Sequence, residues 1–83
     1  MYSVRIIRRA MRDLSNLPQQ YADLLSQHID SLSENPRPRS AKRLQGRTDY
    51  SLRVGDYRII YEIDDRELLV TIYRVKHRLE AYR

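Results

Sequence analysis

The sequence predicts an α+β fold in which two N-terminal helices pack on one face of an antiparallel β-sheet, in the element order β-α-α-β-β-β. Three observations lead to this prediction. Between residues 8 and 32 the apolar side chains recur every three or four positions, which is the period of a helix. Between residues 50 and 75 they follow the pattern of strands, divided in three by two turn sequences. An apolar segment at residues 2–7 adds a first strand.

The first half of the chain contains that strand and both helices. A short amphipathic helix is predicted over residues 8–17, and Pro18 suits the first turn of a second one. The second helix should end at Asn35-Pro36, because a residue that precedes proline is pushed out of the helical region. His28 falls on its apolar side, which favours a core or boundary position without a functional role.

The second half is a connector followed by three strands. Residues 35–48 contain two prolines, one glycine and five basic residues, which predicts a connector with at most a short turn of helix. Strands are predicted over residues 50–54, 57–63 and 68–75. Residues 76–83 are expected to form a turn or a short helix.

A two-residue turn at Gly55-Asp56 fixes the register of the central hairpin. One face is then apolar and pairs three sets of residues: Val54 with Tyr57, Leu52 with Ile59, and Tyr50 with Tyr61. On the other face Arg53 stands directly opposite Arg58. Like charges in this position cost about 0.2–1 kcal/mol. The pair is more easily understood if an anion binds between the two guanidinium groups.

The charge of the chain favours an anionic partner. Its net charge is +5, and fourteen of its sixteen basic residues are arginine, whose planar fork pairs with phosphate through two hydrogen bonds. This bias favours nucleic acid, although arginine is also enriched at protein interfaces. The basic residues gather in three groups: Arg5, Arg8, Arg9 and Arg12; Arg37, Arg39, Lys42, Arg43 and Arg47; and Arg74, Lys76, Arg78 and Arg83.

Length and composition restrict the class of protein. A chain of 83 residues should form a single domain over residues 1–83. It has no cysteine and only two histidines, so neither a disulfide framework nor a metal cluster is expected. The N-terminal residues contain no apolar run long enough for a signal peptide or a membrane span. We therefore expect a soluble cytoplasmic protein without a cofactor.

The sequence resembles the RelE/ParE superfamily of toxins from bacterial and archaeal toxin–antitoxin operons. The resemblance spans nearly the whole chain and is carried by four features: Asn35-Pro36, Leu44-Gln45-Gly46, the segment RVGDYR at 53–58 with Ile60-Tyr61, and VKHR at 75–78 with Tyr82. It implies a RelE-like fold and the toxin of a type II system. In the RelE branch it further implies ribosome-dependent, metal-independent cleavage of mRNA in the decoding site, and a cognate antitoxin that wraps the toxin in a hetero-oligomer.

The resemblance also assigns candidate catalytic residues. Arg58 and Arg78 match family arginines that contact the scissile phosphate, and Tyr82 matches a tyrosine that stacks on or orients the substrate. Arg53 falls where several members have a lysine, which implies a role in charge stabilisation or proton transfer. Ser51 stands where some members carry a second basic residue proposed to assist proton removal. The identity of the general base is therefore open.

Five further residues are expected to bind the RNA substrate: Arg43, Arg47, Arg74, Lys76 and His77. The basic connector that holds Arg43 and Arg47 is consistent both with contacts to RNA backbone and with a solvated loop. His77 has an unperturbed pKa near neutrality, which suits proton transfer. In an extended segment, however, its side chain points away from that of Arg78.

Two other functions fit the same resemblance. One is a ParE-like toxin that binds and poisons DNA gyrase, using the same fold without nuclease chemistry. ParE-like members generally lack the full phosphate-binding set, so a requirement for Arg58 and Arg78 would distinguish the two toxins. The other is an inactive relic that binds antitoxin only, which the serine at position 51 keeps open.

Overall fold

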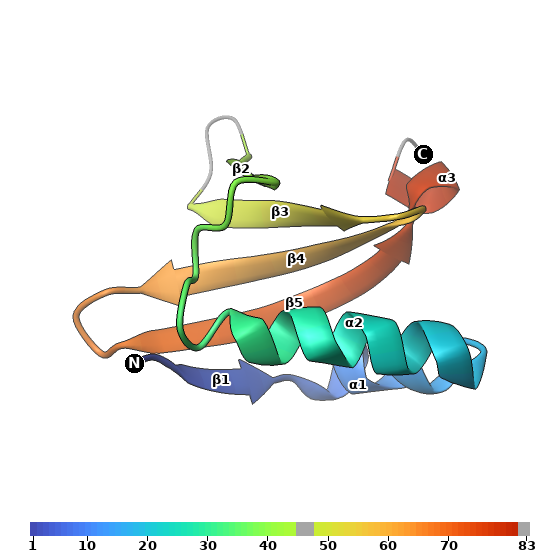
Figure 1. Cartoon of the computed structure of the whole chain (residues 1–83), viewed down its shortest axis with the longest axis horizontal. Coiled ribbons are helices and arrows are strands. Elements are labelled where there is room, and N and C mark those ends of the chain that lie inside the picture. The colour runs from blue at the N-terminus through green and yellow to red at the C-terminus, as the bar shows by residue number, and fades with distance from the viewer. Residues whose placement is uncertain (45–47, 82–83) are drawn as a thin grey trace.

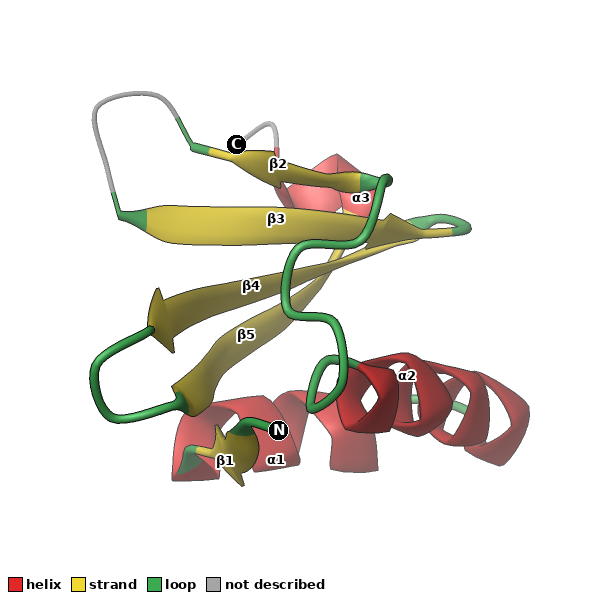
Figure 2. Ribbon diagram, turned by 60° about the vertical axis from the view of Figure 1, so that its left-hand side comes forward, coloured by secondary structure: helices red, strands yellow, loops and turns green. Residues whose placement is uncertain are grey.

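Two helices lie against one side of a five-stranded sheet in the computed structural model, which describes residues 1–44 and 48–81 (Figures 1 and 2). In chain order the elements are β1 (Ser3–Ile6), α1 (Arg8–Ser15), α2 (Gln19–Ser31), β2 (Ala41–Arg43), β3 (Asp49–Val54), β4 (Tyr57–Asp64), β5 (Leu69–His77) and α3 (Arg78–Ala81). No helix within the described residues is long and apolar enough to cross a membrane.

The sheet is mixed, whereas the sequence predicted an antiparallel one. Its strand order is β1-β5-β4-β3-β2, and β1 runs parallel to β5 while the other neighbours are antiparallel. Parallel neighbours need a long crossover connection, and here the two helices begin that crossover directly after β1. The α+β class and the packing of two N-terminal helices on one face are confirmed.

The connector contains a strand that the sequence did not predict. β2 pairs with β3 through three residue pairs: Ala41 with Leu52, Lys42 with Ser51, and Arg43 with Tyr50. Residues 41–43 have no apolar alternation, so their extended conformation is decided by the neighbouring strand and not by local pattern. β2 therefore places basic side chains at the edge of the sheet.

The central hairpin has the predicted register. Val54 pairs with Tyr57, and Arg53 lies opposite Arg58. Gly55 has a φ of +58°, and no such value occurs at Asp56, which is the pattern of a type II′ turn. The backbone twist of this turn matches that of the flanking strands, so the hairpin closes without an extra residue.

The ladder between β4 and β5 contains an irregularity that shifts its register. Ile60 pairs with Arg74, but Tyr61 pairs with Ile72, which leaves Tyr73 as an extra residue on β5. The sequence leaves open whether Tyr73 or Arg74 joins Arg58. Both alternatives are wrong, because the structure places Lys76 opposite Arg58.

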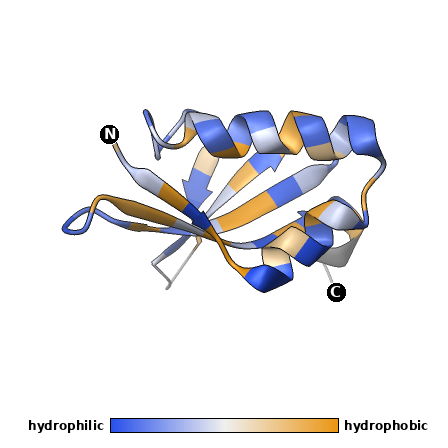
Figure 3. Ribbon diagram, turned by 90° about the horizontal axis from the view of Figure 1, so that it is seen from below, coloured by the Kyte–Doolittle hydropathy of each residue, from blue (hydrophilic) through white to orange (hydrophobic). Residues whose placement is uncertain are grey.

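The hydrophobic core lies between the helices and the sheet. Along the helices hydrophobic and hydrophilic segments alternate, as amphipathic helices require (Figure 3). The buried residues are Ala10, Leu25, Ile29 and Leu32 from the helical half, and Leu52, Val54, Ile59, Tyr61, Val70, Ile72 and Val75 from the sheet. Tyr50 and Tyr57 are half-buried at the margin of this core. His28 is exposed, so its predicted core or boundary position is wrong; the buried stripe of α2 runs through Leu25 and Ile29 instead.

Polar contacts attach the connector after α2 to the end of the sheet. The buried Tyr61 hydroxyl donates a hydrogen bond of 2.7 Å to the Pro36 carbonyl oxygen. Arg37 forms an ion pair of 2.7 Å with Asp65, and its Nε donates to the Tyr50 hydroxyl at 3.1 Å. The hydrogen bond from Arg37 holds the pKa of Asp65 below its usual value. These contacts direct the chain from α2 toward β2.

The Tyr61 hydroxyl should make the stability of the fold decrease at high pH. Burial raises the pKa of Tyr61 to about 12, whereas an unfolded tyrosine has a pKa of about 10. The folded state binds this proton more tightly, so its stabilising effect is complete below about pH 10 and is lost as the pH rises through about 12. The stability curves of the wild type and Tyr61→Phe, measured by urea unfolding, should therefore converge and then cross as the pH rises. The variant starts about 1 kcal/mol less stable because the Pro36 carbonyl loses its donor. Parallel stability curves across this range would contradict the assignment.

Candidate functional site

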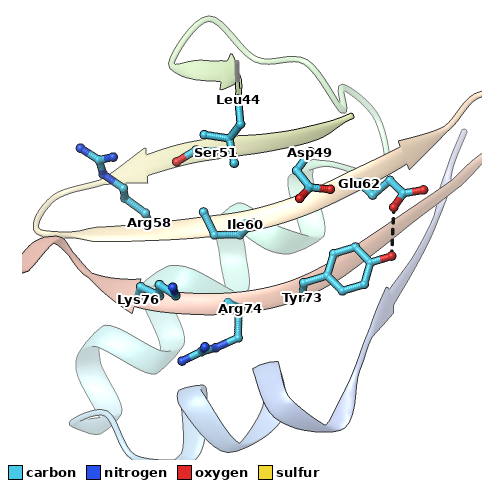
Figure 4. Close-up of a pocket in the computed structure, with 9 residues that line it drawn as sticks. All are labelled: Leu44, Asp49, Ser51, Arg58, Ile60, Glu62, Tyr73, Arg74 and Lys76. Atoms are coloured by element: carbon cyan, nitrogen blue, oxygen red, sulfur yellow. Dashed lines mark hydrogen bonds between the residues drawn. The ribbon is translucent and has the colours of Figure 1, made fainter. Parts of the chain in front are cut away.

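A groove of about 620 Å³ runs across the face of the sheet that turns away from the core (Figure 4). β3 and β4 form its floor, because their outward residues alternate with the buried ones. Its lining consists of Leu44, Asp49, Ser51, Arg58, Ile60, Glu62, Tyr73, Arg74 and Lys76. Arg58 and Lys76 lie at one end, and Glu62 with Tyr73 at the other (Figure 4).

The three predicted catalytic arginines come together beside this groove. Arg53, Arg58 and Arg78 line a hollow of about 200 Å³ with Gly55, Tyr57 and Leu79. Arg58 also lines the groove and a third hollow of about 750 Å³ that extends toward β2. The guanidinium group of Arg58 therefore belongs to a region where several cations converge. Such a region can bind a phosphate group through charge-assisted hydrogen bonds.

The turn between β3 and β4 also positions Arg78. The Arg78 backbone N–H donates to the Asp56 carbonyl oxygen at 2.6 Å, which fixes the start of α3. The Arg78 Nε lies 3.9 Å from Asp56 Oδ1, and both side chains are more than half exposed. An ion pair this open and this long contributes little to stability. Arg78 is therefore available to a ligand although its backbone is anchored.

β5 supplies Lys76 and Arg74, which differ in their surroundings. Lys76 lies directly opposite Arg58 and adds a cation to the same end of the groove. Arg74 lines the groove too, but its Nε donates to Asp13 Oδ2 of α1 at 2.9 Å. The same carboxylate oxygen accepts the Val75 backbone N–H at 2.9 Å. Arg74 thus attaches α1 to the sheet and offers a partly neutralised charge to a ligand.

The remaining predicted residues lie apart from this centre or outside the described part of the chain. His77 is on the opposite face, where its ring meets Tyr57 edge-on at 5.2 Å and its Nδ1 accepts the Leu79 N–H. This placement agrees with the expectation that the His77 side chain points away from that of Arg78. Arg43 is exposed on β2 and lines the third hollow. Arg47 and Tyr82 lie outside the described residues.

The sequence reasoning missed the acidic end of the groove. Asp49 and Glu62 are cross-strand partners there, and both line the groove. The Tyr73 hydroxyl donates to Glu62 Oε2 at 3.0 Å. Burial, and then this hydrogen bond, raise the pKa of Tyr73, so the hydroxyl remains a donor at neutral pH. The predicted register already implied the Asp49–Glu62 pair, whereas the position of Tyr73 depends on the irregularity in β5.

Within residues 1–44 and 48–81, no group of three or more histidine, aspartate or glutamate side chains is arranged to hold a metal ion. In the described site, the cations of Arg53, Arg58, Lys76 and Arg78 line the groove and the hollow beside it, where they can stabilise negative charge.

Comparison with known proteins identifies the family. The family model described as "ParE toxin of type II toxin-antitoxin system, parDE" matches residues 4–82. The chain belongs to the RelE/ParE superfamily of type II toxins. Within that superfamily it is 38% identical over 84 residues to Toxin RelG of Mycobacterium tuberculosis, a match that covers 99% of this chain and 97% of the relative. It is 32% identical over 88 residues to Putative toxin RelE1 of Methanocaldococcus jannaschii, covering 99% and 96%.

Solved structures of RelE/ParE toxins share the fold. The toxin–antitoxin complex RelBE2 from Mycobacterium tuberculosis contains a chain that matches with a TM-score of 0.83 and 38% identity, covering 93% of this chain and 98% of that one. The archaeal RelE–RelB complex from Pyrococcus horikoshii OT3 also gives a TM-score of 0.83, at 29% identity, covering 93% and 94%. The protein is therefore a RelE-like toxin of the type II class, as its sequence motifs predicted.

The facing arginines should limit the stability of the ligand-free toxin. Replacing Arg53 by Gln removes the repulsion across the ladder from Arg58, so we expect Arg53→Gln to be more stable by about 0.2–1 kcal/mol. Urea unfolding at low ionic strength measures this gain, which should shrink in about 1 M salt, where the screening length is about 3 Å. Arg66→Gln, which removes an exposed charge in the β4–β5 turn, is the matched control. A loss of stability specific to Arg53→Gln at low salt would contradict repulsion as the dominant effect.

Proposed function

We propose that this RelE-like toxin is a cytoplasmic endoribonuclease that cleaves mRNA in the decoding site of the ribosome without a metal ion, and so inhibits translation. The observation that carries the proposal is the convergence of Arg53, Arg58 and Arg78 on one hollow beside an open groove. The relatives named RelE and RelG support the same branch of the superfamily.

The chemistry requires three events at one RNA linkage. The ribose 2′-hydroxyl loses a proton, the pentavalent phosphorane carries extra negative charge, and the leaving 5′-oxygen gains a proton. Arg58 and Arg78 are proposed to stabilise the phosphorane, because preorganised cations act where negative charge develops. Arg53 is proposed to assist by charge or proton transfer. Tyr82 retains its proposed role in positioning the substrate.

Other basic residues are proposed to hold the RNA backbone on either side of the cleaved linkage. Lys76 extends the cationic end along β5, and Arg43 extends it toward β2. Arg74 and Arg47 are proposed to add backbone contacts, Arg74 with the smaller contribution because Asp13 already engages it. His77 is proposed to contribute least to substrate binding, because its ring packs on Tyr57 on the opposite face of the sheet.

Removing the proposed phosphate-binding arginines should slow cleavage strongly while the fold is kept. We expect Arg58→Ala and Arg78→Ala each to lower the cleavage rate about 100- to 1,000-fold, the usual effect of deleting one preorganised electrostatic donor. Primer extension on mRNA from translating ribosomes, with EDTA present throughout, measures the rate. Arg66→Ala is the control, since it removes an exposed arginine from a turn outside the three hollows.

The result also separates the nuclease from its alternative. Cleavage within codons that survives EDTA and collapses only in the two site variants supports the nuclease. A folded, growth-arresting protein that leaves mRNA intact would contradict it and would direct attention to gyrase, the target proposed for a ParE-like toxin. Gyrase supercoiling assays with the same variants would then decide whether the arginines matter for that toxicity.

We also propose a cognate antitoxin as partner. The structures from Mycobacterium tuberculosis and Pyrococcus horikoshii are complexes of a toxin with an antitoxin. For this chain, whose net charge is +5, the complementary partner would carry an acidic, amphipathic segment that covers the basic groove and so blocks it.

Association of toxin and antitoxin should depend strongly on salt. Opposite charges steer the encounter, and this steering raises association rates by about 10- to 1,000-fold at low ionic strength. Stopped-flow measurement should therefore show the association rate constant falling as salt increases, while the dissociation rate changes much less. Equal association rates at low and high salt would show that charge contributes little to the encounter.

A further inference from the structure

Two consecutive residues of β5, Tyr73 and Arg74, line the same groove. Neighbouring side chains of a regular strand point to opposite faces, so this pair marks the irregularity of the β4–β5 ladder as a bulge. The bulge decides which side chains beyond it reach the groove. Lys76 lies there opposite Arg58, whereas Val75 is buried in the core. A ladder without the extra residue would turn Lys76 to the core face.

The residues after the bulge have also lost a neighbouring strand. β1 pairs with β5 only as far as Ile6 with Ile72, and α1 begins two residues later at Arg8. Among residues 1–44 and 48–81, no strand flanks the rest of β5 on that side. A buried backbone N–H that finds no acceptor is costly, so such groups are almost always paired. The end of β5 therefore needs an attachment that a strand does not provide.

Asp13 of α1 provides this attachment. Its Oδ2 atom accepts a hydrogen bond of 2.9 Å from the Val75 backbone N–H and one of 2.9 Å from Arg74 Nε. In Figure 4 the Arg74 side chain turns off the edge of β5 toward α1. The Asp13 side chain is 15% exposed, so both bonds are largely shielded from water. One carboxylate oxygen thus holds the two residues that directly follow Tyr73.

We propose that Asp13 is a positioning residue for RNA binding, because it fixes β5 in the shifted register that places Lys76 opposite Arg58. Asp13 does not line the groove, so it acts on the RNA only through β5. This inference rests on the proposed function, since it concerns the RNA backbone contact assigned there to Lys76. It gives α1 a part in shaping the groove on the far side of the sheet edge.

The contact with Val75 is the one that fixes the register. Its N–H belongs to the main chain, so the bond restrains the backbone one residue before Lys76. Arg74 is held at the end of a long side chain, whose many rotamers leave the main chain free to move. The required property of residue 13 is therefore a hydrogen-bond acceptor and not a negative charge.

Two double variants of equal charge separate the acceptor from the ion pair. Both carry Arg74→Gln, which removes the ion pair, and they differ in having Asp13→Asn or Asp13→Ala. The asparagine side-chain oxygen can accept the Val75 N–H, whereas alanine offers no acceptor. Hydrogen exchange followed by NMR should show the Val75 amide exchanging about 3- to 10-fold faster in the alanine protein, the effect of losing one hydrogen bond.

The salt dependence of RNA binding shows whether Lys76 still contacts the backbone. The probe is the 2′-O-methyl hexanucleotide of uridine, which lacks a reactive 2′-hydroxyl. Adding Lys76→Gln to the asparagine protein should reduce the slope of log K against log salt by about 0.7, the value of one phosphate contact on a single strand. In the alanine protein Lys76→Gln should leave the slope unchanged. Arg66→Gln, which removes an exposed charge from the β4–β5 turn, should change the slope in neither protein.

The outcomes separate this inference from the proposed nuclease activity. An equal effect of Lys76→Gln in both proteins, equal exchange at Val75, or no salt-dependent binding of the probe would each overturn the positioning role. Asp13→Leu, which resembles asparagine in shape but has no acceptor, replaces alanine if that protein does not fold. Unfolding of both would assign Asp13 to stability alone and would also overturn the role. A Lys76 contact that depends on the acceptor, in a protein that never cleaves mRNA, would refute the nuclease proposal alone.

Discussion

The two-residue turn at Gly55-Asp56 is the constraint on which the functional face depends. Gly55 has a φ of +58°, a conformation that L side chains rarely adopt, although a Cβ at this position would meet no atom within 4 Å. Glycine is therefore required by backbone conformation and not by lack of space. A hairpin one residue out of register would turn every side chain of one strand to the opposite face. The arginine pair, the acidic pair and the buried side chains between them all follow from this single register.

The hairpin can carry two pairs of like charge because its other face is well packed. Leu52, Ile59 and Tyr61 are almost completely buried against the helices, and burial of such side chains contributes about 1.5–3 kcal/mol each. This exceeds the roughly 0.2–1 kcal/mol that a like-charge pair costs. The groove is thus maintained by residues on the opposite face of the sheet. Contacts at the far end of the sheet, from Tyr61 to Pro36 and from Arg37 to Asp65, hold the connector so that β2 can flank the groove.

Local signals allowed part of this structure to be predicted from the sequence. The hairpin register follows from two turn residues, and the helices follow from apolar spacing, so Arg53 facing Arg58 could be deduced directly. The parallel pairing of β1 with β5 joins the two ends of the chain, and no local pattern encodes it. The three residues of β2 have no apolar alternation, so their extended conformation depends on pairing with the edge of β3. β5 is apolar on both faces, so its sequence does not show where an extra residue interrupts the ladder. The sequence therefore did not predict that Tyr73 would contact Glu62.

The turn also positions Arg78, because both the backbone carbonyl and the side-chain carboxylate of Asp56 contact this residue. The backbone carbonyl of Asp56 accepts the N–H of Arg78, and its carboxylate lies 3.9 Å from the Arg78 Nε. Because the backbone bond is short and the ion pair is open, the position of Arg78 depends mainly on the main chain of the turn. The same two residues therefore set the separation of Arg53 and Arg58 within the ladder and the place where α3 begins beside them. Arginines from three separate elements, β3, β4 and α3, converge because a single tight turn lies between the first two and anchors the third.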